Sequence, residues 1–114
     1  NETDFLDRLD ILVEKAHEVL RKKADFVEKQ TELGMYPFSR YYLSDIKKRF
    51  NRYWANHFLT IGVVAMHEAC LNMFGVGIDD PTGYQFAIDV MDFLFNKCLE
   101  LQEKYGYLTN LEAT

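Results

Sequence analysis

The side chains of this sequence that could do nucleophilic, redox or metal chemistry are two cysteines and three histidines. Cys70 and Cys98 each stand inside an apolar helical pattern and lack the close spacing of a zinc or redox pair. No acidic or thiol ligand is spaced with His17, His57 or His67. We therefore expect two reduced, buried thiols and no metal site.

Two pairs of neighbouring carboxylates could serve as a general acid and a general base. They are Asp89 with Asp92, and Glu100 with Glu103. Each pair falls on the polar side of an expected helix, where solvated acidic residues are common, so neither pair is interpreted as catalytic. The sequence shows no self-contained catalytic set.

Thr60, Gly62 and Glu68 form a candidate binding set near an expected strand-to-helix junction. Gly62 would let another backbone or a ligand approach closely. A structural role is the simpler interpretation, because a carboxylate such as Glu68 in the first turns of a helix is favoured by the helix dipole without any ligand.

The spacing of apolar residues predicts a mainly α fold of four helices and two short buried strands. The helices are expected at residues 5–33, 41–54, 63 or 64 to 74, and 81–105, and the strands at residues 58–64 and 108–114. Thr3 or Asp4 is expected to cap the first helix and Gly34 to end it. Asp80 is expected to cap the last helix, which ends before Gly106.

The two long helices carry apolar residues at helical spacing, which are expected to face the core. In the first helix these are Phe5, Leu9, Leu12, Ala16, Val19, Leu20 and Val27, and in the last they are Ala87, Val90, Met91, Leu94, Cys98, Leu101 and Tyr105. Phe86, Phe93 and Phe95 widen the apolar face of the last helix, so that helix is expected to be covered on several sides.

The two strands are expected to pair in parallel, because the long helical connection between them allows a crossover. Two strands alone make a poor sheet with unpaired edges. The chain also begins with Asn1 rather than Met, and its last residues, NLEAT, are expected to enter a strand. We therefore expect residues 1–114 to be a single helical piece of a larger protein.

Composition limits the partners of the chain. A net charge of -5 over 114 residues gives no general attraction to nucleic acid or anionic lipid, and no apolar run is long enough to span a membrane. The basic residues of the KKR run at 47–49, together with Arg52, fall on different sides of a helix and are interpreted as a solvated surface. We expect a cytoplasmic protein.

The chain resembles the anaerobic, class III ribonucleoside-triphosphate reductases. The resemblance lies in NRYWANHFLTIGVVAMHEACLNMFG, in LQEKYGYLTNLEAT and in the upstream LGMYPFSRYYL, and it extends in order over residues 5–114. The family reads approximately NHFSTIG-x-x-GMNE and Q-x-x-x-G-x-x-x-NLEATPAEGTSYR in the first two stretches. This chain differs at Leu59, where the family usually has Ser, at Ala65, where Gly is common, and at His67, where Asn is common.

The resemblance implies a parent enzyme that reduces ribonucleoside triphosphates by glycyl and thiyl radical chemistry, with formate or a dithiol as reductant. It implies a ten-stranded α/β barrel, a structural zinc, ATP and dNTP effectors, a homodimer and a radical-SAM activating enzyme as partner. Neither Cys70 nor Cys98 matches the family's radical cysteine, and no glycine of this chain lies in the glycyl-radical motif. The resemblance therefore implies no catalytic residue and no cofactor within this chain, and no activity of the chain alone.

The resemblance also points to a binding role for Asn110, Glu112 and Thr114. In the family the NLEAT strand continues into a turn rich in Pro, Gly, Thr and Ser, and backbone amides and hydroxyls at such a turn bind phosphate well. These three residues are therefore expected to line the parent's substrate site, with Thr60 and Gly62 as weaker candidates. In the alternative, Asn110 and Glu112 only hydrogen-bond to neighbouring strands.

Two other functions stay open from the sequence. The chain could be a free-standing helical module that binds a partner helix through its aromatic face. It could also belong to another glycyl radical enzyme, such as a relative of pyruvate formate-lyase, although the NLEAT strand and the TIG turn favour the nucleotide enzyme. Uncovered apolar surface would make the isolated chain self-associate.

Overall fold

The computed structural model describes residues 1–113, which form five helices and two strands. The helices are α1 (Glu2–Glu32), α2 (Pro37–Tyr42), α3 (Ser44–Phe50), α4 (Met66–Phe74) and α5 (Pro81–Tyr105), and the strands are β1 (Leu59–Val63) and β2 (Thr109–Ala113). The expected mainly α class is confirmed. No helix among the described residues is both long enough and apolar enough to cross a membrane.

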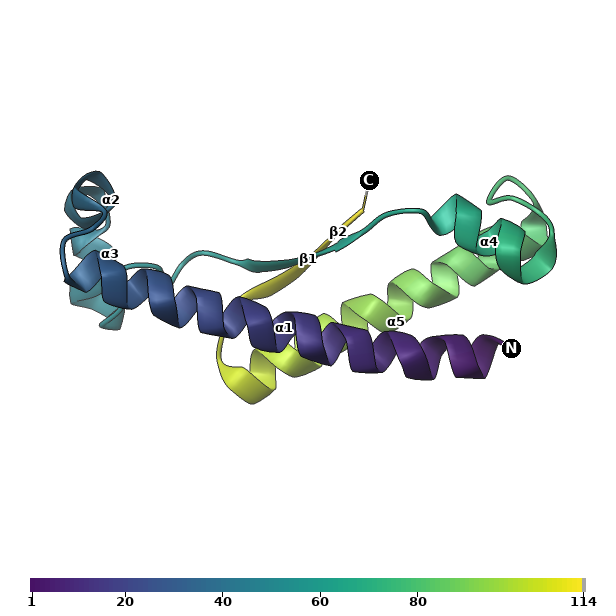
Figure 1. Cartoon of the computed structure of the whole chain (residues 1–114), viewed down its shortest axis with the longest axis horizontal. Coiled ribbons are helices and arrows are strands. Elements are labelled where there is room, and N and C mark those ends of the chain that lie inside the picture. Colours follow the sequence, from purple (N-terminus) through teal and green to yellow (C-terminus); the bar gives the residue numbers. More distant parts are fainter. Residues whose placement is uncertain (114) are drawn as a thin grey trace.

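The molecule is elongated, with extents of 52 × 24 × 20 Å. Helix α1 runs along most of its length, α4 and the start of α5 lie near the N-terminus, and α2 and α3 form the opposite end (Figure 1). Strand β1 packs against α1, and β2 packs against α5. The sheet is thus held between the two ends by the two long helices.

Helix α1 starts earlier than expected. The side chain of Asn1 accepts a hydrogen bond from the Asp4 amide at 2.8 Å and caps the helix, so the predictions of Thr3 or Asp4 as the cap were wrong. The expected end is confirmed, because Gly34 follows the helix with a φ of 86°. Asparagine caps well because its short side-chain oxygen reaches a free amide of the first turn.

The buried face of α1 is more polar than expected. Its buried residues are Val13, His17, Glu28 and Thr31, while Leu12 and Val19 are exposed. The predicted apolar face was wrong at these two positions and at Ala16, which is also exposed. The physical reason is that α5 and the sheet cover one side of α1 only, and the polar residues on that side find hydrogen-bond partners.

The second predicted helix is two short helices instead. Pro37 occupies the first turn of α2, and the chain breaks at Leu43 before α3, where the Ser44 hydroxyl donates to the Tyr41 carbonyl at 2.9 Å. Helix α3 ends at Asn51, which adopts the left-handed conformation with a φ of 62°. The helix predicted over residues 41–54 was therefore wrong at both ends, and five helices replace the expected four.

The two strands form a parallel pair, as expected, with Thr60 opposite Asn110 and Gly62 opposite Glu112. The expectation that the strands are buried was wrong for most of their residues, since only Ile61 and Thr109 are buried. The helices cover one face of the sheet, and no described element covers the other.

The loop between α4 and α5 lies against the first turn of α5 at a close contact between two glycines. A Cβ atom added to Gly83 would lie 2.1 Å from the carbonyl oxygen of Gly77, so only glycine fits there. The Cys70 thiol donates to the Gly83 carbonyl at 3.4 Å. Nearby, Phe86 packs edge-on against Phe5 and Phe74 at ring distances of 5.3 and 5.2 Å.

Helix α5 has its expected boundaries. The Asp80 side chain accepts from the Thr82 amide at 2.9 Å, and Gly106 ends the helix with a φ of 75°. However, the expectation that α5 is covered on several sides was wrong, since Phe95 and Tyr105 are exposed. One side of α5 packs on α1, α4 and β2, and the opposite side faces outward.

Candidate functional site

Four of the candidate binding residues lie together on the uncovered face of the sheet. Side chains alternate between the two faces of a strand, and parallel partners point the same way. Thr60 and Gly62 on β1 therefore share a face with Asn110 and Glu112 on β2, and all four are exposed. We call this surface the outer face. Thr114, the fifth candidate, lies outside the described residues.

The side chains of Thr60 and Asn110 are joined on the outer face. The Thr60 hydroxyl donates to the Asn110 side-chain oxygen at 2.7 Å. This bond fixes which way the Asn110 amide is turned, because its oxygen is occupied and its two N–H groups point away. The outer face thus presents two amide donors and, two residues further along β2, the carboxylate of Glu112.

Gly62 does not behave as its sequence position suggested, whereas Glu68 lies in the first turn of a helix, as expected. No described atom lies within 4 Å of a Cβ added to Gly62, so no backbone of these residues approaches it closely. The residue that makes the strand-to-helix turn is Ala65, with a φ of 65°. Glu68 lies exposed in the first turn of α4 rather than on the sheet.

The covered face of β2 is anchored by a buried histidine. His17 is fully buried, and its Nε2 lies 2.9 Å from the Thr109 hydroxyl oxygen. Its Nδ1 is hydrogen-bonded by the Arg21 guanidinium, which also stacks 3.5 Å from the centre of the Tyr105 ring. Burial and the charge of Arg21 lower the pKa of His17 below its ordinary value, against a weaker opposing effect of Glu14.

The thiols of Cys70 and Cys98 are both buried in the packed interior. Burial raises the pKa of the Cys98 thiol, so it stays protonated, and its Sγ lies 4.0 Å from the Asn110 carbonyl oxygen. Cys70 is fully buried between α4 and α5. Because the thiolate is the reactive form of cysteine, the surroundings of Cys98 do not activate it as a nucleophile.

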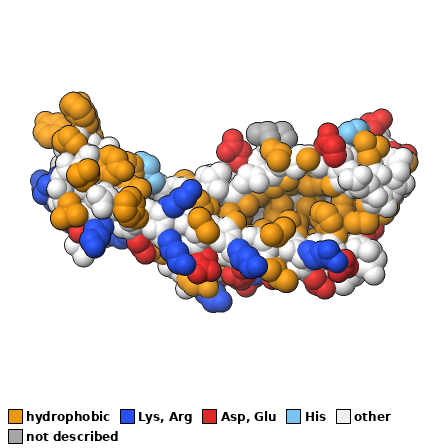
Figure 2. Space-filling view, viewed as in Figure 1, with side chains coloured by type: hydrophobic (Ala, Val, Ile, Leu, Met, Phe, Trp, Pro, Cys, Tyr) orange, Lys and Arg blue, Asp and Glu red, His pale blue; other side chains and the backbone are white. Residues whose placement is uncertain are grey.

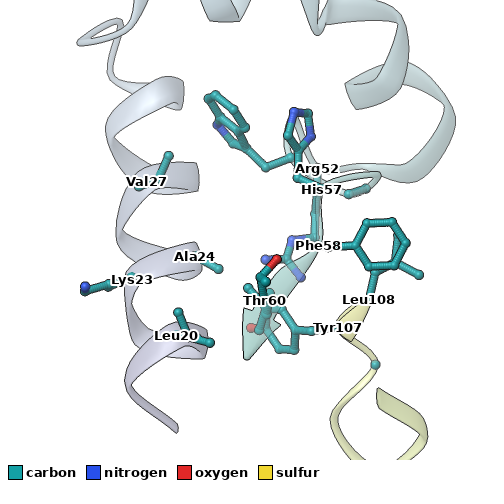
Figure 3. Close-up of a pocket in the computed structure, with 14 residues that line it drawn as sticks. Leu20, Lys23, Ala24, Val27, Arg52, His57, Phe58, Thr60, Tyr107 and Leu108 are labelled. Carbon is teal, nitrogen blue, oxygen red and sulfur yellow. The ribbon is translucent and has the colours of Figure 1, made fainter. Parts of the chain in front are cut away.

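A pocket of about 330 Å³ opens between α1 and the beginning of β1 (Figure 3). Leu20, Lys23 and Val27 line it from α1, and Arg52 and Tyr107 line it from the segments before the two strands. Arg52 lies 3.3 Å from Asp25, and its guanidinium stacks 4.7 Å from the Tyr107 ring centre. Burial raises the pKa of Tyr107, and the hydrogen bond that the Tyr107 hydroxyl donates to Asp25 raises it further.

A second pocket, of about 300 Å³, is an apolar groove bordered by α1, β1, α4 and α5. Leu9, Leu12 and Ala16 form its α1 side, and Ile61 and Met66 form part of the opposite side. Figure 2 shows it as a hollow of hydrophobic side chains on the face turned to the viewer. Its lining carries no charged group, which distinguishes it from the first pocket.

Within residues 1–113, no group of three histidine, cysteine or carboxylate side chains is arranged to hold a metal ion. His17, His57 and His67 have separate neighbours: Thr109, Asn56 and the Ile78 amide, respectively. The donor set therefore does not fit a zinc site formed by the described part of the chain.

A scan against protein families matches all residues, 1–114, to the family described as anaerobic ribonucleoside-triphosphate reductase. This chain belongs to that family. Searches of curated proteins and of solved structures gave no significant match. Among the alternatives open from the sequence, the family match favours the nucleotide-reducing oxidoreductase over an unrelated helical module or a pyruvate formate-lyase relative.

In this reductase-family chain, two buried polar residues, Lys97 and His17, were not predicted from the sequence although their positions indicate burial. Lys97 is 7% exposed on the inner side of α5, and its ammonium group lies 2.7 Å from Glu14 and 3.0 Å from Asp10. Burial disfavours its charge, but the hydrogen bonds from Lys97 to Glu14 and Asp10 outweigh this and raise its pKa. The signal was its position three residues after Leu94, on the apolar face.

His17 carried a similar signal, because it stands four residues after Val13 and three before Leu20 on the same side of α1. A polar residue at such a position must find a partner inside the protein. Its partner Thr109 follows in the chain after 91 other residues, with a sequence separation of 92. The separation explains why the sequence could indicate a buried histidine but not the group that it binds.

Proposed function

We propose that the chain forms part of the catalytic domain of an anaerobic ribonucleotide reductase and that the outer face lines the ribonucleoside-triphosphate site. The family match supports the activity of the parent enzyme. The observation that carries the site is that Thr60, Asn110 and Glu112 share one exposed face in register. A polar cluster on an uncovered sheet is suited to a ligand that offers both hydroxyls and anionic oxygens.

The chemistry of the outer face suggests how a nucleotide lies on it. Asn110 offers N–H donors to sugar or phosphate oxygens, because its own oxygen is bonded to Thr60. The Glu112 carboxylate repels a triphosphate and accepts hydrogen bonds from hydroxyls. We therefore place the ribose beside Glu112 and the triphosphate away from it, toward the N–H donors of Asn110.

Both edges of the two-stranded sheet lack a further strand among residues 1–113. Two strands are seldom stable alone, and open edges pair readily with other strands. We propose that these edges are covered by further strands of a ten-stranded α/β barrel in the parent enzyme. The exposed apolar side of α5 would then be covered by the same domain.

The radical residues belong to other parts of the parent enzyme in this proposal. Cys98 is a buried thiol with a raised pKa, and Cys70 is enclosed between two helices, which suits neither of them to meet a ribose. A glycyl radical formed by a radical-SAM activating enzyme, a structural zinc, ATP and dNTP effectors and a homodimeric assembly are likewise proposed for the parent. We place this enzyme in the cytoplasm and propose that the isolated chain is inactive.

The test uses variants of the intact reductase, assayed without oxygen. Asn110→Ala and Glu112→Gln each remove hydrogen bonds to a polar substrate, so we expect kcat/KM to fall by about 10- to 100-fold. Glu103→Gln, an exposed change on α5, is the matched control and should keep wild-type activity. Wild-type kcat/KM in both sheet variants would contradict the proposed site.

A further inference from the structure

We infer that His17 is a positioning residue: it holds β2 through Thr109 and so fixes Asn110 and Glu112 on the outer face. The inference rests on the proposed function, because it gives His17 a role in the nucleotide site without contact to the substrate. It requires one protonation state of the imidazole, which the surrounding hydrogen bonds identify.

The hydrogen bonds assign the neutral form with the proton on Nε2. The Arg21 guanidinium can only donate, so Nδ1 of His17 must be the acceptor and carries no proton. A neutral imidazole then carries its proton on Nε2, which donates to the Thr109 hydroxyl at 2.9 Å. The hydroxyl in turn donates to the Tyr107 carbonyl at 3.0 Å, so each proton in this chain of bonds has one acceptor.

The groups around His17 disfavour a second positive charge. On α1 it faces Arg21 and, more weakly, Glu14. On α5 its ring lies 5.8 Å from that of Tyr105, over which both Arg21 and Lys104 are placed. Protonation of Nδ1 would remove the acceptor of Arg21 and leave two cations in contact within a buried site.

The orientation of Thr109 decides which side chains β2 presents on the outer face. Its amide donates to the Gln102 side chain at 2.9 Å, and the preceding carbonyl, of Leu108, accepts from the Leu59 amide at 2.7 Å. A slip of one residue in a strand moves every side chain to the other face. Holding Thr109 inward therefore holds Asn110 and Glu112 outward.

The experiment is hydrogen exchange with mass spectrometry on the intact reductase, comparing protection of residues 107–113. Thr109→Val keeps the shape but removes the hydroxyl, and we expect about a tenfold loss of protection. Thr109→Ser should restore it. The control is Thr31→Val, at another buried threonine, whose hydroxyl accepts a hydrogen bond from Trp54 Nε1; this variant should lose protection near residue 54 alone.

Two histidine variants separate positioning from simple packing. Gln places a donor N–H near the position of Nε2, so His17→Gln should keep most of the protection that His17→Ala loses. In the wild type, protection of residues 107–113 should fall as the pH drops below the ordinary histidine pKa of 6.5, because the imidazole then binds a proton in the opened state that its lowered pKa disfavours in the folded state. In His17→Gln it should not change with pH, since glutamine does not titrate.

The inference is overturned if Thr109→Val and Thr31→Val give the same protection over residues 107–113, or if His17→Gln is no better than His17→Ala. The inference is also overturned if the protection of residues 107–113 depends on pH in the same way in the wild type and in His17→Gln. If exchange behaves as expected while Asn110→Ala keeps full activity, the nucleotide site is wrong but the hold on β2 is confirmed. If both the hold on β2 and the nucleotide site are correct, kcat/KM of Thr109→Val falls while that of Thr109→Ser stays at the wild-type value.

Discussion

The two ends of the molecule, with α4 at one end of α1 and with α2 and α3 at the other (Figure 1), are held together by different kinds of contact. Near the N-terminus, Phe5, Phe74 and Phe86 pack edge-on, and Gly83 lies against Gly77. At the other end, no residue of α2 or α3 is buried. That end is joined to α1 mainly by polar bonds.

The polar end depends on two buried side chains of α1. The Glu28 carboxylate accepts from the amides of Tyr53 and Trp54 at 2.6 and 3.1 Å, and Thr31 accepts from the Trp54 indole at 2.8 Å. Phe38, on α2 at the same end, is 80% exposed and so contributes little apolar packing. The apolar end should therefore respond to changes of side-chain volume, and the polar end to the loss of single hydrogen-bond acceptors.

The largest expected effect is at the apolar end. Gly83→Ala places a Cβ atom 2.1 Å from the Gly77 carbonyl oxygen, so either the loop that carries Gly77 or the first turn of α5 must shift. We expect a loss of about 3 kcal/mol in the free energy of unfolding, measured by urea titration with circular dichroism. Gly62→Ala, where the space is open, should change it by less than about 0.5 kcal/mol. Equal effects of the two changes would contradict the contact.

At the polar end, Glu28→Ala leaves the amides of Tyr53 and Trp54 without their acceptor. We expect a loss of about 2 kcal/mol, because a buried donor without a partner costs its full desolvation. Trp54 is the only tryptophan in the chain, so its fluorescence reports on this end directly. Glu32→Ala, which removes an exposed ion pair with Lys47, is the control and should have little effect. An unchanged Trp54 signal in Glu28→Ala would show that this end is held in another way.

Between the ends, Lys97 joins α5 to α1. Lys97→Ala leaves Asp10 and Glu14 facing each other without a cation, so we expect a loss of about 2 kcal/mol. Lys97→Met removes the same charge but keeps the apolar stem of the side chain packed, so it should cost about half as much. Thermal unfolding would distinguish them, and a more stable Lys97→Ala would be inconsistent with the ion pairs.

The smallest effect is expected at the turn between β1 and α4. Ala65 adopts a φ of 65°, which glycine tolerates far better than a residue with a Cβ atom. Ala65→Gly should therefore raise the stability by about 1 kcal/mol. Ala69→Gly, inside α4, should lower it by about 1 kcal/mol. If both changes destabilise the protein, the left-handed turn is not strained.

The same turn shows how far the sequence could predict the structure. The resemblance led us to expect glycine at position 65, and the left-handed backbone found there is a physical reason for that expectation. The start of α4 at Met66 was still missed by two or three residues, because the run before it has the composition of both a strand and a buried helix. The break at Leu43 was missed for a similar reason, since aromatic residues at helical spacing continue across it.

Elements with strong local signals, and the family of the chain, can be identified from the sequence alone. Asp80 before Pro81, and Gly34 and Gly106 after the long helices, act within one turn of backbone, so they can be identified without a fold. The alternation of side chains along a strand likewise places Asn110 and Glu112 on the same side of β2, because they are two residues apart.

Only the tertiary structure decided which faces are covered and what the buried polar groups bind. Thr60 and Asn110 meet because β1 and β2 pair in register, and His17 meets Thr109 because α1 lies against the sheet. Such contacts join residues far apart in sequence, and their energies depend on distance and burial rather than on local pattern. For this reason the sequence indicated the two long helices and the family, while the supports of the proposed nucleotide site required the fold.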